Sequence, residues 1–261
     1  MLHDAFFITR LVVLDDDGSK EKESSMVKRI SVLMFCLWAA LSVCRTAAAE
    51  GTVPKEPNET IHYGVEPFGS SVYEDFGVVD FQGKKLNLTV FSTEALGFDD
   101  TEKIYSDPVT GYPIRVERDV KMWMGREYLT EDYSPFNHSV VINKFKDNKL
   151  VQEYRFKGSG PLDNAVIVPF SLRKAPILET GWSKKIILPE EYIVKLEGIE
   201  EVSVPAGKFK AYHFLSLPEK FEVWISADEL RLPVKIRGLG GLSYTLVMKK
   251  RVLKGEAAAT P

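Results

Sequence analysis

The chain has 261 residues and a hydrophobic fraction of 44%, which is ordinary for a globular protein of one large or two small domains. Its 34 basic and 37 acidic residues give a net charge of −3, so it has no positive field with which to hold phosphate backbones. We therefore expect no nucleic-acid partner.

The first part of the chain carries the features of a bacterial export signal. Lys28 and Arg29 precede an uncharged apolar run over residues 30–43, and the small-residue triplet Ala47-Ala48-Ala49 follows it. A positive region, an apolar region and an A-x-A site in this order are typical of a signal peptide. The apolar run is also shorter than the roughly 20 residues of a membrane span.

We therefore predict a signal peptide over residues 26–49, cleaved between Ala49 and Glu50. A buried core helix is the alternative, which the flanking charges and the alanines disfavour. The mature chain is then a periplasmic protein of the bacterial envelope without a transmembrane span.

Residues 1–25 precede the charged region, although a signal peptide begins at the initiator methionine. They include the acidic run Asp15-Asp16-Asp17. Lys22-Glu23 can be encoded by a ribosome-binding sequence at a suitable distance from Met26. We predict that translation starts at Met26 and that the first 25 residues are a mis-assigned or disordered extension, which the nucleotide sequence would test.

Both cysteines, Cys36 and Cys44, lie in the predicted leader, so the cleaved chain has no thiol and no disulfide. The segment Leu41-Ser42-Val43-Cys44 resembles the lipobox of lipid-anchored proteins. Val43 is bulkier than the small residue that normally precedes the lipidated cysteine. A lipid anchor at Cys44 is therefore the less favoured alternative.

The mature chain divides into a flexible leader (50–60), a single β domain (61–253) and a flexible tail (254–261). Within the domain, side chains alternate between apolar and polar, as in strands with one wet face. Residues 114–124 show this most clearly, with Ile114, Val116, Val120, Met122 and Met124 on one face and Arg115, Glu117, Asp119 and Lys121 on the other.

Turn residues separate the strands. Residues 140–145 and 150–156 flank Asp147-Asn148, a pair that tolerates positive φ, and therefore form a hairpin. Gln82-Gly83-Lys84 predicts a second hairpin between residues 78–81 and 86–91. The C-terminal part is predicted as a meander with strands over 192–196, 201–204, 209–215, 221–225, 233–237 and 242–249.

One short helix is predicted over residues 164–172, with Asp163 as its N-cap and Pro169 limiting its length. The fold class is therefore all-β: a curved antiparallel sheet that forms an open or incomplete barrel or sandwich, with one helix near residues 164–173. A helix of this size cannot cover the apolar face of such a sheet. Either the sheet therefore folds onto itself or a ligand fills the gap.

Short motifs with a characteristic order follow from residue 163 onward. The motif residues are Asp163, Arg173, Gly181, Pro205, Gly207, Phe209, Trp224, Asp228 and Pro233. With these motifs, the chain over residues 61–250 resembles the exported bacterial family catalogued as domain of unknown function 3108. The resemblance implies an antiparallel β protein of the cell envelope, without an established activity, whose shape is similar to that of periplasmic lipoprotein carriers that hold acyl chains.

A structural role explains most of these motif residues. Pro205 and Gly207 suit a tight β connection, Pro233 can begin a strand, and Trp224 can cap a core. Asp163 and Arg173 leave two interpretations open: a partly buried ion pair that fixes the helix to the sheet, or a helix cap and an independent surface arginine.

No catalytic, metal-binding or cofactor-binding residue is predicted. The histidines that remain after cleavage, His62, His138 and His213, lie in no nucleophile motif and lack the spacing of zinc ligands. Gly238, Gly240 and Gly241 join two strands and precede no helix. An enzyme would be favoured only by a cleft that gathers His138 or His213 with a carboxylate.

The leading functional hypothesis is a non-enzymatic binding or carrier protein for a lipid, an acyl chain or a partner segment. The alternative is an envelope assembly or structural protein that uses exposed strand edges to contact other envelope proteins. Lipid that co-purifies with the protein would separate the first hypothesis from the second.

Overall fold

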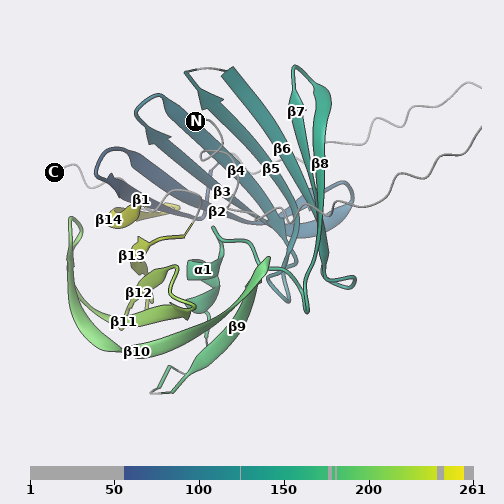
Figure 1. Ribbon diagram of the computed structural model, residues 1–261. Coiled ribbons are helices and arrows are strands. Elements are labelled where there is room, and N and C mark those ends of the chain that lie inside the picture. Colours follow the sequence, from purple (N-terminus) through teal and green to yellow (C-terminus); the bar gives the residue numbers. More distant parts are fainter. Residues whose placement is uncertain (1–55, 124, 176–177, 180, 240–243, 256–261) are drawn as a thin grey trace, which may run out of the picture.

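The computed structural model describes residues 56–123, 125–175, 178–179, 181–239 and 244–255. These residues form one antiparallel sheet of 14 strands, which is not closed into a barrel, and one short helix. The structure confirms the predicted all-β class with an open sheet (Figure 1). Several features of the sequence analysis lie outside the described residues. They are the predicted leader with its Ala49/Glu50 cleavage point, Cys44, Met26, Met124, Gly240, Gly241 and residues 256–261.

The elements follow one another with short connections. They are β1 (Glu59–Glu66), β2 (Ser70–Phe81), β3 (Lys84–Ala95), β4 (Phe98–Ser106), β5 (Pro113–Met122), β6 (Gly125–Ser134), β7 (Ser139–Lys146), β8 (Lys149–Lys157), α1 (Val168–Leu172), β9 (Ser183–Leu188), β10 (Glu190–Val204), β11 (Gly207–Leu217), β12 (Glu222–Ser226), β13 (Pro233–Arg237) and β14 (Thr245–Leu253).

The first and last strands are neighbours in the middle of the sheet, where Glu59 pairs with Leu253 and Glu66 with Thr245. From this seam, β1 to β8 extend to one side and β14 back to β9 extend to the other. We call these the N-terminal wing and the C-terminal wing. Figure 1 shows that the C-terminal wing curls beneath the N-terminal wing and that α1 lies between them.

The main hydrophobic core lies where the C-terminal wing, the seam and α1 meet. Val168, Phe170 and Leu172 of α1 are all buried in it. The ring of Phe170 stacks on that of Tyr73 from β2, with 3.5 Å between the ring centroids. The helix therefore packs against strands of both wings, although it has only five residues.

The helix is shorter than the sequence pattern predicted. It begins at Val168, with Ile167 at the N-cap position, and Asp163 does not cap it. The Asp163 carboxylate instead accepts a hydrogen bond from the Ile187 backbone at 3.0 Å. The Asn164 side chain accepts one from the Val166 backbone at 2.9 Å, so the preceding residues form turns.

Both predicted hairpins are confirmed. Asp147 and Asn148 have φ values of 50° and 60° and join β7 to β8, and Gln82 and Gly83, with φ values of 52° and 78°, join β2 to β3. The predicted strand over residues 114–124 is β5, which ends two residues earlier. Its alternation holds around Val116 and Val120, which are both buried.

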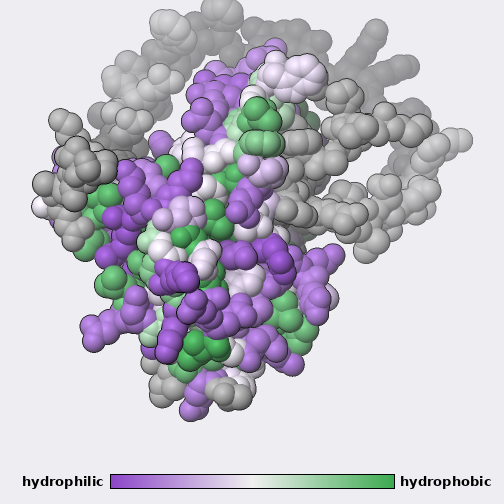
Figure 2. Space-filling view, turned by 90° about the vertical axis from the view of Figure 1, so that its left-hand side faces the viewer, coloured by the Kyte–Doolittle hydropathy of each residue, from purple (hydrophilic) through white to green (hydrophobic). Residues whose placement is uncertain are grey.

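The molecular surface shown in Figure 2 carries apolar side chains in separate patches among hydrophilic ones. Among the described residues, no helix has the length and apolar character needed to cross a membrane.

Gly238 provides a test of the connection from β13 to β14. Its φ is 79°, and a Cβ at this position would lie 2.2 Å from the Lys220 carbonyl oxygen. Since both the conformation and the space exclude a side chain, we expect Gly238→Ala to lower the free energy of unfolding by about 3 kcal/mol or more.

The matched control is Gly198→Ala, because a Cβ at Gly198 meets no atom within 4 Å. This control is expected to change stability by no more than about 0.5 kcal/mol. Urea denaturation followed by tryptophan fluorescence measures both values, and equal effects of the two substitutions would contradict the assignment of this turn.

Candidate functional site

A cavity with an accessible volume of about 150 Å³ lies between the two wings. Its walls come from β3 to β8, the segment before α1, α1 itself and the region of β13 and β14. Most of the lining is apolar, with side chains such as Phe91, Leu129, Val140, Phe170 and Leu246. An apolar cavity of this volume can hold a molecule about the size of benzene, which has six non-hydrogen atoms.

Charged side chains of the N-terminal wing form the polar part of the lining. Arg118 of β5 lies opposite Glu102 of β4, while Glu131 of β6 lies opposite Val116 of β5. Asp100 is two residues before Glu102, so it points to the same face of β4. We call Asp100, Glu102, Arg118 and Glu131 the inner charge cluster.

Arg118 is the centre of this cluster. Its Nε lies 2.9 and 3.1 Å from the two carboxylate oxygens of Asp100, and its Nη2 donates to Asp100 Oδ2 at 2.5 Å. Glu102 Oε1 lies 3.3 Å from the same Nε. Since the Nε hydrogen bonds to Asp100, Glu102 has an electrostatic contact with Arg118 but receives no hydrogen bond from it.

Two further contacts border the cluster. The Tyr133 hydroxyl donates to Glu131 Oε2 at 2.6 Å. Lys144 of β7 pairs with Glu127 of β6 at 2.8 Å. Around this end of the cavity, four carboxyl groups therefore share two cations, which leaves an excess of negative charge in a poorly solvated place.

This arrangement raises the pKa values of Glu102 and Glu131. Burial raises the pKa of Glu102 to about 7, with the positive charge of Arg118 opposing the shift and the Asp100 and Glu131 charges adding to it. Burial also raises the pKa of Glu131, against the hydrogen bond from Tyr133 and the charge of Arg118. Glu102 and Glu131 therefore gain protons more readily than solvent-exposed glutamates do.

Asp163 and Arg173 do not pair with each other. Asp163 lines the cavity and bonds to Ile187 on β9 through both its backbone and its side chain. Burial raises the pKa of this carboxyl group, and the Ile187 hydrogen bond opposes the shift. Asp163 thus joins the segment before α1 to the edge strand of the C-terminal wing.

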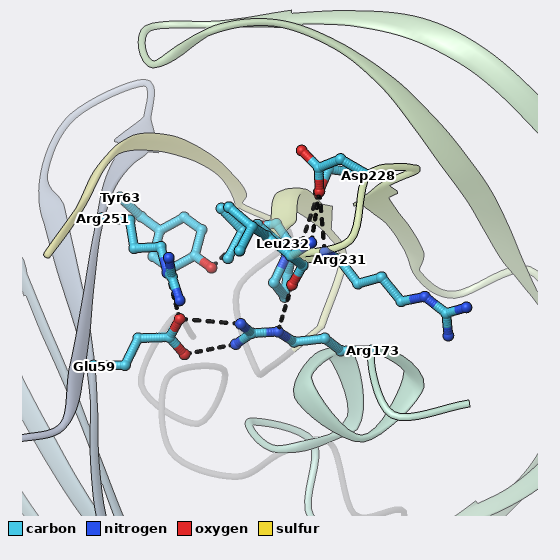
Figure 3. Close-up of polar contacts among 10 residues, drawn as sticks. Glu59, Tyr63, Arg173, Asp228, Arg231, Leu232 and Arg251 are labelled. Atoms are coloured by element: carbon cyan, nitrogen blue, oxygen red, sulfur yellow. Dashed lines mark hydrogen bonds and ion pairs between the residues drawn. The ribbon is translucent and has the colours of Figure 1, made fainter. Parts of the chain in front are cut away.

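Arg173 belongs to an ion-pair network at the seam, shown in Figure 3. Its Nη1 and Nη2 donate to the two oxygens of Glu59 at 2.6 and 3.0 Å, and its Nε donates to the Leu230 carbonyl at 3.2 Å. Arg251 of β14 donates to Glu59 at 2.5 Å. Arg173 therefore connects the end of α1 to Glu59 on β1, a partner that neither of the two sequence-based interpretations named.

Burial raises the pKa of Glu59, but the hydrogen bonds and charges of Arg173 and Arg251 outweigh it and lower the pKa below its ordinary value. Tyr63, on the same strand, donates from its hydroxyl to the Pro233 carbonyl at 2.9 Å. Both contacts tie β1 to the C-terminal wing. Their role is structural, since neither Glu59 nor Arg173 lines the cavity.

The other C-terminal motif residues also serve the architecture. Asp228 accepts hydrogen bonds from the Leu230 and Arg231 backbone and from the Ser226 hydroxyl, which fixes the turn before β13. Pro233 begins β13. The Trp224 side chain is buried in the core and bonds to Glu200 through its indole nitrogen.

The residues of the turn motif and Gly181 have roles in the backbone conformation. Pro205 and Ala206 connect β10 to β11, and Gly207 has a φ of 135°. Phe209 packs against the main core. Gly181 has a φ of 90°, and a Cβ there would meet no atom within 4 Å, so backbone conformation is the only constraint that the structure places on it.

His213 does contact carboxylates, but it does so away from the cavity. Its Nε2 lies 2.9 Å from Glu222 and its Nδ1 lies 3.7 Å from Glu200, while its ring stacks on Trp224 at 4.5 Å between centroids. Burial lowers the pKa of His213. Neither His213 nor His138 lines the cavity, so the condition that would favour an enzyme is not met there.

Sequence reasoning missed the inner charge cluster. Arg118 lies between Val116 and Val120 on the face of β5 that was predicted to be apolar, and Glu131 lies on the same face of β6 as Leu129. A charge between apolar neighbours at a spacing of two is the signal that marks these positions.

Among the described residues, no group of three histidine, cysteine or acidic side chains has a metal-binding arrangement.

Comparison with family models, curated proteins and solved structures found no match to this chain. The resemblance to the domain of unknown function 3108 family therefore stays a prediction from the motifs. The fold and the site define a class of protein that has an open antiparallel sheet and an amphipathic cavity between the two wings of the sheet.

We expect Glu59→Gln to destabilise the protein, because it removes the only carboxylate in contact with Arg173 and Arg251 among the described residues. Breaking a largely buried pair by removing one partner costs about 3 kcal/mol. Asp80→Asn is the control, since Asp80 and its partner Lys85 are both exposed, and such a pair contributes less than about 1 kcal/mol. Chemical denaturation at pH 7 measures both, and a smaller effect at Glu59 than at Asp80 would contradict the network.

The raised pKa of Glu102 predicts that the stability of the protein depends on pH. Because its folded-state pKa lies near 7, above that of an unfolded glutamate, the folded protein binds more protons between about pH 4.5 and 7 and loses stability as the pH rises through this window. Glu102→Gln removes this loss. We expect the variant to gain about 1–3 kcal/mol relative to the original protein between pH 5 and pH 8.

The measurement is urea denaturation of both proteins at pH 5 and pH 8. Asp132→Asn is the control, because Asp132 lies on the opposite face of β6, pairs with Arg115 and is half exposed. A difference between the original protein and Glu102→Gln that does not change with pH would contradict the raised pKa.

Proposed function

We propose that this protein binds an amphiphilic small molecule, with its apolar chain held between the wings, and acts as a non-enzymatic carrier in the bacterial envelope. The observation that supports the proposal is the cavity itself, which has apolar walls over most of its surface and the charged groups of the inner charge cluster in its lining. A cavity that served only as packing space would have no use for buried charges, which are costly to desolvate.

The fold explains why such a space exists. One face of each wing is apolar and must be covered, and α1 covers only part of it with four buried apolar residues. The wings approach each other without closing into a barrel. An apolar ligand segment of about six non-hydrogen atoms would fill the remaining volume and gain the free energy of apolar burial.

The envelope location is supported by the sequence alone. The positive region, the apolar run and the alanine triplet before Glu50 are the features that favour export. The resemblance to the domain of unknown function 3108 family points in the same direction. Identification of Glu50 as the first residue of protein recovered from the periplasm would support this part of the proposal.

The test of binding is mass spectrometry of an organic-solvent extract of the purified protein. We expect co-purifying amphiphile in near-stoichiometric amount with the original protein and a several-fold smaller amount with Ala165→Leu, since Ala165 lines the cavity and a leucine there fills part of it. Ala227→Leu is the control, because Ala227 lies in a turn outside the cavity lining.

The carrier proposal fails if the extract of a folded original protein contains no amphiphile and if added chain-bearing compounds do not bind. Direct titration with decanol, followed by displacement of N-phenyl-1-naphthylamine, covers the case in which the ligand is lost during purification.

A second candidate function is envelope assembly through a strand edge. The outer edge of β8 has no strand partner in the described sheet, and its Leu150 and Val151 are 55% and 54% exposed. Such an edge can accept a strand from another protein. The charged residues Lys149, Arg155 and Lys157 on the same strand oppose unspecific pairing. A stable complex that is lost on Val151→Pro, without bound amphiphile, would favour this function over the carrier.

A further inference from the structure

The charged residues in the cavity lining restrict the chemistry of the ligand more than the apolar walls do. The ionisable groups that line the cavity come from five strands and two other segments, and they are Asp100, Glu102, Arg118, Glu131, Tyr133, Lys144, Tyr154, Asp163 and Tyr244. Of the two cations, Arg118 bonds to Asp100 and Lys144 pairs with Glu127. The positive groups are thus already engaged by carboxylates.

Glu102 is the carboxylate with the poorest set of partners. Its side chain is only 12% exposed, it lines the cavity, and its contact with Arg118 Nε is an ion pair without a hydrogen bond. None of the described residues donates a hydrogen bond to it. A carboxylate that is removed from water and accepts no hydrogen bond is costly. A ligand that donates a hydrogen bond to Glu102 would remove this cost.

Glu131 is the second carboxylate at this end. It has one donor, the Tyr133 hydroxyl, for two oxygens. Burial raises the pKa of Tyr133, as does the nearby Glu131 charge, so the phenol keeps its proton and remains a donor. Glu131 and Glu102 both lie near Arg118, on strands either side of β5.

We infer that the ligand is a cationic amphiphile: a protonated amine at one end that binds between Glu102 and Glu131, and an apolar chain that extends along the cavity walls. The inference rests on the proposed function, because it specifies the ligand of the same cavity. An ammonium group offers up to three N–H donors and a positive charge, which supplies what the two carboxylates lack. A carboxylate or phosphate head group would instead add a negative charge to an already negative place.

The enclosed volume limits how much of the chain it can cover. Space for a molecule about the size of benzene corresponds to the amine group and about five carbons, if the head group lies at the inner charge cluster. The rest of a longer chain would extend beyond the enclosed volume.

The experiment compares three compounds with the same chain and different head groups. Decylamine, decanol and decanoate, each below its micellar concentration, displace N-phenyl-1-naphthylamine from the purified protein at pH 8. We expect decylamine to bind at least tenfold more tightly than decanol, and decanoate to bind more weakly than decanol.

Two variants locate the preference. Glu102→Gln and Glu131→Gln keep the shape of the side chain and remove its charge, and each is expected to reduce the preference for decylamine over decanol by about fivefold or more. Asp132→Asn, which removes a charge from the opposite face of β6, is expected to leave the preference unchanged. Thermal denaturation of each variant shows whether it is folded.

The outcomes separate this inference from the proposed function. Equal binding of the three compounds, or preferred binding of decanoate, would overturn the cationic ligand and leave the carrier function intact. Failure of all three to bind a folded protein would overturn both. Tighter binding of decylamine that persists in both glutamine variants would also overturn the inference, because the positive charge would then be recognised elsewhere.

Discussion

The pairing of β1 with β14 is the interaction on which the rest of the structure depends. It joins the two ends of the described chain in the middle of the sheet, so every other strand is placed by its distance from this seam. Glu59 lies at the end of the seam and binds Arg251 from the neighbouring strand and Arg173 from the end of α1. The same residue therefore fixes the seam and the helix that separates the two wings.

Short-range patterns predicted the two hairpins and the buried positions of β5, because hairpins and strand faces are set by neighbouring residues. They wrongly divided β10 into two strands, over 192–196 and 201–204. Asp147-Asn148 and Gln82-Gly83 adopt the positive φ values that tight turns need, and Val116 and Val120 are buried as their alternation requires. The helix was placed less well. Asp163 has the right residue type for an N-cap, but a tertiary hydrogen bond to Ile187 takes its carboxylate, which no local pattern reveals.

The site was harder to predict than the fold, for a related reason. The strands β4, β5 and β6 bring Glu102, Arg118 and Glu131 together through register, and register depends on turn geometry that the sequence specifies only in part. Each charge alone resembles an ordinary surface residue. Only their common face, shared with buried valines and leucines, distinguishes them, and the seam of β1 with β14 that brings the second wing over that face is a long-range contact.

Among the described residues, the segment after β8, and no further strand, lies against the free side of β9 at Ile187. Asp163 receives a backbone hydrogen bond from Ile187 through its side chain and donates its own backbone N–H to the Ile187 carbonyl, so both polar groups of Ile187 on the free side of β9 are satisfied. A position on a strand edge that is already hydrogen-bonded does not recruit a partner strand. At Ile187 the edge of β9 is therefore closed to β8, which lies at the other end of the sheet. Asp163 also lines the cavity, so the residue that covers this edge position borders the volume between the wings.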